Sequence, residues 1–224
     1  MSASRIAVLI MARAPLPGAA KTRLQPLLGP QGCARLQAEL IRHTMRLAER
    51  AAPADTYLAL DPPDAVEPVP DGVRRLGQQG EHLGARMSHA VKDVLRQHTG
   101  HVLVIGTDAP TLSLAHLREA ATYLDEGHDV VFGPAVDGGY YLVGLRDRSS
   151  VDVDLGAVFG IDPGLWGGPG VLAASLALAH TAGLRCRLLE PLRDLDTPAD
   201  ARVLARDASV PSVIAELLRP PVIA

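Results

Sequence analysis

The sequence has few aromatic residues, only two cysteines, no basic excess and no long apolar run. Of 224 residues, 3% are aromatic, and the two cysteines are Cys33 and Cys186. Cysteines so far apart, with no C-x-x-C pattern, argue against a disulfide framework and against a zinc site. The 22 basic and 25 acidic residues give a formal net charge of −3. That balance argues against a partner that is nucleic acid or an anionic membrane.

The apolar stretches of the sequence are too short to predict a membrane-spanning helix. The longest, such as residues 171–179, fall well below the roughly 20 residues that a membrane-spanning helix requires. The N-terminal segment MSASRIAVLIMARAP has the pattern of a strand that leads into a loop, and not that of a cleaved signal. We therefore expect a cytoplasmic protein, with one domain over residues 1–224.

The sequence does contain an alternation of strand and helix patterns. Apolar runs predict strands at residues 5–11, 55–61, 73–78, 101–106, 129–135, 140–146 and 185–190. Helical spacing of apolar residues predicts helices at residues 30–51, 81–98, 114–126, 169–182 and from residue 198 onward. The alternation predicts an α/β fold with a mostly parallel central sheet and helices on both faces. Ligands of such sheets bind at the carboxyl ends of the strands, so polar residues that follow strands are candidate site residues.

The loop PGAAKTRL, residues 17–24, follows the first predicted strand. It lacks the glycine directly before the lysine that a Walker A loop needs, and no G-x-G-x-x-G fingerprint is present. Around a small backbone that includes Gly18, this region presents Arg13, Lys21, Thr22 and Arg23. Lysine acts on phosphate as a point charge and arginine as a two-pronged donor. We predict phosphate contact here, with a solvated basic loop as the alternative.

Carboxylates follow two other predicted strands. Asp108, beside Thr107, suits a hard divalent cation that is held jointly with substrate phosphate, and capping of the next helix is the alternative. In LRDLDTPADA, Asp194 and Asp196 lie on one side of an extended segment and repel each other unless a cation lies between them. Asp196 or the following threonine is alternatively the cap of the last helix. Since these segments are expected at the same sheet edge as Lys21, a shared divalent ion is a natural solution.

Glycines and tyrosines mark the segment GPAVDGGYYLVGL. Gly138 and Gly139 permit close backbone approach or a positive φ, and Asp137 suits a sugar hydroxyl, a metal or an acceptor. Because adjacent strand residues point to opposite faces, at most one of Tyr140 and Tyr141 is expected to line the pocket.

A further segment, QQGEHLGARM, leads into a predicted helix. Gln78 and Gly84 suit contact with the edge of a base or sugar, and a plain helix entry is the alternative. The chain has no H-E-x-x-H pattern and no G-x-S-x-G elbow, so it offers no support for the hydrolase chemistry of either motif.

Together, PGAAKTRL, GTDAPTL, GPAVDGGYYLVGL and DLDTPADA resemble the DUF2064 family of proposed glycosyltransferases, over about residues 5–205. The resemblance places the chain in the nucleotide-diphospho-sugar transferase superfamily and implies a GT-A-like (Rossmann-like) three-layer αβα sandwich. It implies Mg²⁺ or Mn²⁺ as the cofactor, held by Asp108 and Asp196 with Asp194 next in line. It implies a nucleotide-sugar donor and a small-molecule acceptor as partners, and it leaves a homodimer open.

The resemblance also assigns roles within this transferase. Asp108, Asp137 and Lys21 are the predicted catalytic residues, with Asp137 positioning or deprotonating the acceptor hydroxyl. The residues predicted to contact the nucleotide are Arg13, Gly18, Lys21, Thr22, Arg23, Gln78, Gly84, Thr107, Gly138 and Gly139.

One departure from the family pattern keeps other functions open. Glycosyltransferases of this fold often have D-x-D at the metal strand, whereas the triplet TDA has the single carboxylate of Asp108. The loop AKTRLQP is similar to that of 2-phospho-lactate guanylyltransferases, and DLDTP recurs among molybdenum-cofactor nucleotidyltransferases. A nucleotidyltransferase that releases pyrophosphate is therefore the alternative, and a catalytically silent nucleotide-binding module is a third hypothesis.

Overall fold

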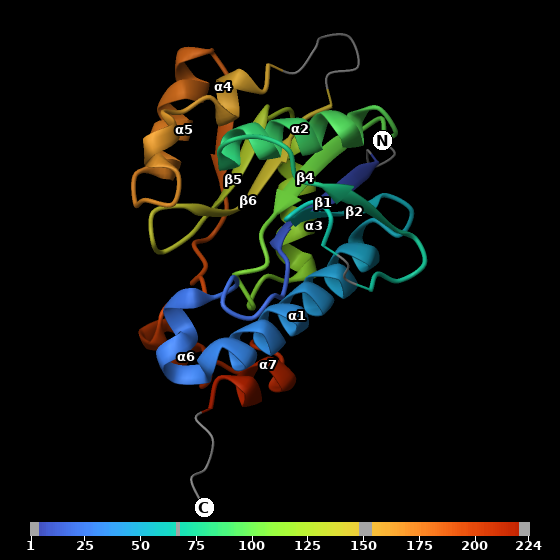
Figure 1. The fold of residues 1–224 in the computed structure, drawn as a ribbon. Helices are drawn as coiled ribbons and strands as arrows, with labels where there is room; N and C mark the ends of the chain where they lie inside the picture. Colours follow the sequence, from blue (N-terminus) through green and yellow to red (C-terminus); the bar gives the residue numbers. More distant parts are fainter. Residues whose placement is uncertain (1–4, 66–67, 148–153, 220–224) are drawn as a thin grey trace, which may run out of the picture.

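A seven-stranded sheet forms the centre of the protein, which is represented by a computed structural model that describes residues 5–65, 68–147 and 154–219 (Figure 1). Its strand order is β3-β2-β1-β4-β6-β5-β7. The strands are β1 (Ile6–Arg13), β2 (Thr56–Asp61), β3 (Val73–Gly77), β4 (His101–Ile105), β5 (Val130–Pro134), β6 (Tyr140–Leu145) and β7 (Cys186–Leu188). Neighbouring strands are parallel except at β6, which is antiparallel to both β4 and β5.

Helices cover both faces of this sheet. The α-helices are α1 (Gln25–Ala51), α2 (Leu83–Leu95), α3 (Leu114–Asp125), α4 (Gly156–Phe159), α5 (Val171–Thr181), α6 (Pro198–Leu204) and α7 (Ser212–Leu217), with 3-10 turns η1 (Thr22–Leu24) and η2 (Pro163–Leu165). In Figure 1, α2, α4 and α5 lie on one side of the sheet and α1 and α3 on the other. The predicted α/β three-layer fold is thus confirmed.

The apolar run of β1 is continuous because both of its faces are covered. Val8 and Ile10 belong to a buried cluster that also contains Met45 of α1 and residues of α3. The alternate residues Ala7 and Leu9 belong to the opposite cluster, with residues of α2 and α4. Alternate residues along the strand thus pack against the helices on opposite faces of the sheet.

A third buried cluster holds the C-terminal segment against the start of α1. Leu24 and Leu36 pack there with Leu195, Leu204 and Ile214, and all five are at most 1% exposed. This cluster fixes the segment after β7, which carries Asp194 and Asp196, beside the loop after β1. Two ends of the sequence therefore meet at one edge of the sheet.

Several elements differ from the sequence-based prediction. The first long helix begins at Gln25 instead of residue 30, although its backbone leaves helical geometry at Gly29 (φ 65°, ψ 169°), directly before Pro30. The short helix α4 was not predicted, because it is too short to show apolar spacing over two turns. The helix predicted from residue 198 onward is two short helices, α6 and α7. Within the described residues, none of the helices combines the length and the apolar character that crossing a bilayer demands.

Candidate functional site

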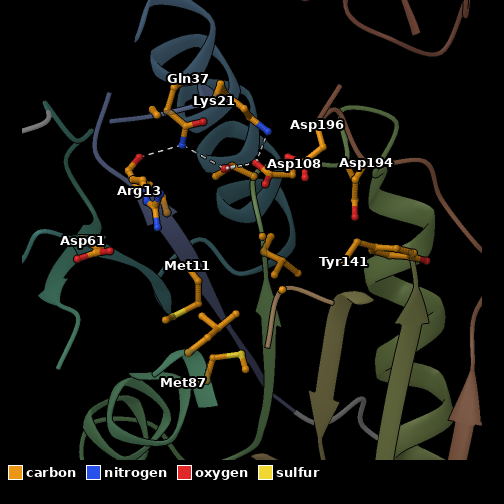
Figure 2. A pocket seen from close by; sticks show the side chains of 18 of the residues that line it. Met11, Arg13, Lys21, Gln37, Asp61, Met87, Asp108, Tyr141, Asp194 and Asp196 are labelled. Atoms are coloured by element: carbon orange, nitrogen blue, oxygen red, sulfur yellow. Dashed lines mark hydrogen bonds and ion pairs between the residues drawn. The ribbon is translucent and has the colours of Figure 1, made fainter. Parts of the chain in front are cut away.

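The candidate site is a cavity of about 530 Å³ at the carboxyl ends of β1 to β4 (Figure 2). Because β6 is antiparallel, its first residue Tyr140 reaches the same edge. The cavity is lined by Met11, Ala12, Arg13, Ala20, Lys21, Thr22, Arg23, Gln37, Asp61, Gln78, Leu83, Arg86, Met87, residues 104–109, Tyr140, Tyr141, Val143, Gly167, Asp194 and Asp196. Its size lies in the range of small-molecule sites in proteins.

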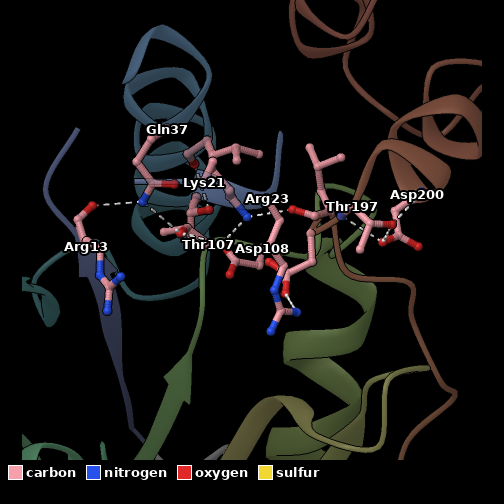
Figure 3. Close-up of polar contacts among 12 residues, drawn as sticks. Arg13, Lys21, Arg23, Gln37, Thr107, Asp108, Thr197 and Asp200 are labelled. Atoms are coloured by element: carbon pink, nitrogen blue, oxygen red, sulfur yellow. Dashed lines mark hydrogen bonds and ion pairs between the residues drawn. The ribbon is translucent and has the colours of Figure 1, made fainter. Parts of the chain in front are cut away.

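Lys21 joins three distant segments at the charged end of this cavity. Its backbone is in the left-handed region (φ 51°, ψ 40°), and its side chain is only 4% exposed. Nζ lies 2.7 Å from Asp108 Oδ1 and donates a hydrogen bond of 2.7 Å to the carbonyl oxygen of Leu195 (Figure 3). The lysine therefore ties the loop after β1 to the segments after β4 and after β7.

Asp108 presents one occupied and one unoccupied carboxylate oxygen. Oδ1 accepts from Lys21 Nζ and from Thr107 Oγ1 at 3.2 Å, whereas Oδ2 has no partner among the described residues. Thr107 is in turn 3.4 Å from Nε2 of the buried Gln37, which also donates to the Arg13 carbonyl at 2.8 Å. Ser113, and not Asp108, caps α3, so the capping alternative for Asp108 is wrong.

Asp194 and Asp196 reach the cavity from the segment after β7. Burial, followed by the charges of Asp108 and Asp137, raises the pKa of Asp194 to about 7. Burial also raises the pKa of Asp196, although the charges of Lys21 and Arg23 oppose the rise. Asp196 Oδ2 lies 3.2 Å from Arg23 Nη1. The cap of α6 is Thr197, so the Asp196 carboxylate is not occupied by the helix start.

These carboxylates fit a divalent cation that is bound jointly with phosphate. Asp194 and Asp196 lie on the same wall as Asp108 in Figure 2, and burial, followed by the negative charges of Asp108 and Asp137, raises the pKa of Asp194. Within the described parts of the chain, no three His, Cys, Asp or Glu side chains are placed to hold a metal by themselves. Mg²⁺ is commonly held by one or two carboxylates, with the remaining ligands from water and substrate phosphate.

The structure brings most of the predicted site residues together but leaves five outside the cavity lining. Arg13, Lys21, Thr22, Arg23, Gln78, Thr107, Asp108, Asp194 and Asp196 line it, whereas Gly18, Gly84, Asp137, Gly138 and Gly139 do not. Asp137 is exposed, and its Oδ1 accepts from the backbone N–H of Gly139 at 2.9 Å. Its negative charge contributes, after burial and Asp108, to the raised pKa of Asp194.

Two of these glycines have packing roles. A Cβ on Gly138 (φ 94°) would lie 2.1 Å from the Pro169 carbonyl oxygen, so glycine allows this turn to approach the start of α5. A Cβ on Gly84 would lie 2.4 Å from the Phe159 carbonyl oxygen and 2.7 Å from the Trp166 ring. The helix-entry alternative therefore accounts for Gly84, and the structure gives no support to its predicted contact with a nucleotide.

The expectation that at most one adjacent tyrosine lines the pocket is wrong. Tyr141 packs with the cluster under α1 and α3, and Tyr140 packs with the opposite cluster. Both line the cavity, because it extends over the end of the sheet and reaches both faces. Tyr141 Oη donates to the Glu190 carbonyl at 3.0 Å, which fixes its ring beside Asp194 (Figure 2).

Sequence reasoning did not identify several lining residues. Gln37 lies within a long helix and Arg86 one turn into another, where no local pattern marks a polar residue as functional. Asp61 did carry a signal, since it ends a predicted strand. It forms an ion pair with Arg86, which also lines the cavity, with 2.6 Å between Oδ2 and Nη1.

Comparison with known proteins identifies the family. Residues 44–159, more than half of the chain, match the model of a family described as "Uncharacterized protein conserved in bacteria (DUF2064)". The chain belongs to the DUF2064 family. A search of curated proteins gave no match.

Solved structures share the fold of this DUF2064 chain. A candidate nucleotide-diphospho-sugar transferase from Desulfovibrio desulfuricans G20 is 28% identical, with a TM-score of 0.80 over 96% of this chain and 94% of that one. A cytidylyltransferase from Leptospira borgpetersenii is 11% identical (TM-score 0.55, 96% and 92% covered). CMP:2-keto-3-deoxy-manno-octonic acid synthetase, complexed with CTP, is 13% identical (TM-score 0.53, 90% and 97% covered). The latter two show the fold alone.

Proposed function

We propose that this protein transfers a sugar from a nucleotide-sugar donor to a small-molecule acceptor, with a divalent cation. The observation that carries the proposal is the convergence of Lys21 with Asp108, Asp194 and Asp196 on one cavity. Carboxylates gathered at a sheet edge are costly unless cations balance them, and a metal–diphosphate group fits that requirement. The similarity to the candidate nucleotide-diphospho-sugar transferase, at 28% identity, supports the same substrate class.

In this reaction the acceptor hydroxyl oxygen attacks the anomeric carbon of the donor sugar. The bond from that carbon to the phosphate oxygen breaks, and the nucleoside diphosphate leaves with the electron pair. Arg13 and Arg23, both exposed at the cavity, would bind the phosphates. Lys21 holds Asp108 and adds positive charge where the leaving group becomes more negative.

The carboxylates would have two roles: to hold the metal ion and to accept the proton of the acceptor hydroxyl. Bound Mg²⁺ or Mn²⁺ would neutralise the charge that develops on the diphosphate, and Asp108, with Asp196 or Asp194, would hold it. The hydroxyl proton of the acceptor would pass to the exposed carboxylate of Asp137, whose Oδ2 has no partner among the described residues.

Nucleotidyl transfer is the second candidate, and one observation favours it. The carboxylates of this site come from separate segments, after β4 and after β7, in place of a D-x-D on one strand. In that reaction a phosphate oxygen of a sugar phosphate attacks the α-phosphorus of a nucleoside triphosphate, and pyrophosphate leaves. The cytidylyltransferase neighbour has the same fold, which hosts both chemistries.

The released product separates these functions. The protein is first screened for thermal stabilisation by nucleotides and nucleotide sugars with Mn²⁺, since ligands that bind only the native state raise the melting temperature. Nucleotide sugars are then incubated with acceptor alcohols, and nucleoside triphosphates with sugar 1-phosphates. Nucleoside diphosphate release, absent in Asp108→Asn, supports glycosyl transfer. Pyrophosphate release supports the alternative, and binding without either product would indicate a silent binding module.

A further inference from the structure

The cavity has a second end with different chemistry from its charged end. Figure 2 shows Asp61, Met11 and Met87 on the side opposite Asp194 and Asp196. We define the base end as Met11, Asp61, Gln78, Leu83, Arg86 and Met87, all of which line the cavity. Three of these side chains are apolar and three are polar, a mixture that suits a flat ring with a polar edge. If the charged end takes a diphosphate, as proposed above, the nucleobase falls here.

The amide of Gln78 has a forced orientation. Its Nε2 donates to two backbone carbonyls, Ala12 at 3.0 Å and Ala59 at 2.9 Å. Carbonyls only accept, so the nitrogen must face them and the oxygen must face the other way. Oε1 has no partner among the described residues and is not fully enclosed, although Gln78 as a whole is 8% exposed. The atom that Gln78 offers to the cavity is therefore an acceptor.

Asp61 also offers a hydrogen-bond acceptor to the cavity. Oδ2 is 2.6 Å from Arg86 Nη1, and Oδ1 has no partner within the described residues. Arg86 also donates from Nε to the Gly80 carbonyl at 3.1 Å, so two of its three nitrogens face the protein. Arg13 keeps uncommitted donors, but it is exposed, and among the described residues its side chain donates only to the Ala19 carbonyl, at 3.5 Å. Its charge and exposure suit phosphate.

We propose that the base end selects a nucleobase that presents N–H donors, an amino base such as cytosine, adenine or guanine, and discriminates against uracil. Gln78 Oε1 and Asp61 Oδ1 accept from the amino edge. A uracil in the same place could donate only from N3–H to one of these acceptors, and its O4 carbonyl would face the other, which would be left without a hydrogen bond. This inference rests on the proposed nucleotide function.

The test compares ligands that differ by one exchange of amino for carbonyl or by loss of the amino group. Dissociation constants of CDP and UDP, of ADP and inosine diphosphate, and of GDP and inosine diphosphate are measured on the full chain with Mg²⁺. The single tryptophan, Trp166, next to the lining residue Gly167, gives a fluorescence signal. In each pair that binds, we expect the ligand with the amino group to have a dissociation constant roughly tenfold lower. That is the usual effect of leaving a buried acceptor unpaired in the other ligand.

Variants test the two acceptors further. Asp61→Asn turns an amide N–H₂ toward the cavity while its oxygen stays on Arg86, so the CDP-to-UDP preference should fall by roughly threefold or more. Asp64→Asn, on the exposed connection that follows, is the matched control and should keep the wild-type preference. Equal or tighter binding of UDP and inosine diphosphate would overturn the inference but leave the nucleotide function standing. Binding of none of the five ligands would contradict both.

Discussion

Replacement of Lys21 by methionine tests the charged end of the cavity most severely. The variant removes a hydrogen bond from a charged donor to the Leu195 carbonyl, in a side chain that is only 4% exposed. Such a bond contributes about 1.5–3 kcal/mol. The ion pair with Asp108, whose side chain is 47% exposed, adds at most about 1 kcal/mol. We expect a loss of about 2–4 kcal/mol, which corresponds to a fall in Tm of roughly 4–16 °C for a chain of this size.

The measurement is thermal unfolding followed by circular dichroism, with turnover measured in parallel. Lys92→Met, an exposed position on α2, removes the other lysine of the chain and should leave Tm and turnover unchanged. Turnover of Lys21→Met should fall by about 10²–10³, the usual effect of removing one positioned donor from developing charge. A Lys21→Met protein as stable and as active as Lys92→Met would refute the reasoning.

Three further variants probe separate parts of the site. Asp108→Asn should lose turnover by about 10²–10³ with little change in Tm, because its side chain is half exposed; full turnover would remove Asp108 from the mechanism. Burial and neighbouring carboxylates raise the pKa of Asp194 to about 7. The metal-free protein should therefore lose stability as pH rises from about 4 to about 7, because the native state holds a proton that the unfolded state releases. Asp194→Asn should lack that loss and exceed the parent in urea resistance at about pH 8, and identical pH profiles would contradict this. Gly138→Ala should cost about 2 kcal/mol or more because its Cβ would meet Pro169, whereas Gly18→Ala, at a similar φ with open space, should cost about 1 kcal/mol. Equal losses in urea unfolding would show that the close approach at Gly138 does not matter.

The layered arrangement of sheet and helices could be predicted from local sequence patterns. The runs at β1 and β4 are apolar on both faces, which predicts parallel strands under helices. The antiparallel direction of β6 could not be predicted, because its sequence is as apolar as that of the parallel strands and its direction depends on long-range pairing. The same reversal brings Tyr140 to the cavity.

The structure brings several of the predicted site residues to one cavity, but their detailed pairing could not be predicted from the sequence. Strand ends predicted that Lys21, Asp108 and Asp196 line one cavity. The contact between Lys21 and Asp108 depends on a left-handed backbone at a non-glycine residue, which no propensity rule favours. The close packing of Gly84 on Trp166 depends on how α2 meets a distant loop. Such contacts are tertiary and cannot be predicted from the spacing of residues in the sequence.

The most direct test of the central claim is crystallographic. The protein would be crystallised with Mn²⁺ and the nucleoside diphosphate that stabilises it most, and the manganese would be located by its anomalous scattering. We predict one ion in the cavity beside Lys21, bound by Asp108, by Asp194 or Asp196, and by diphosphate oxygens. Diphosphate bound away from these side chains, or manganese at another place on the protein, would contradict the account.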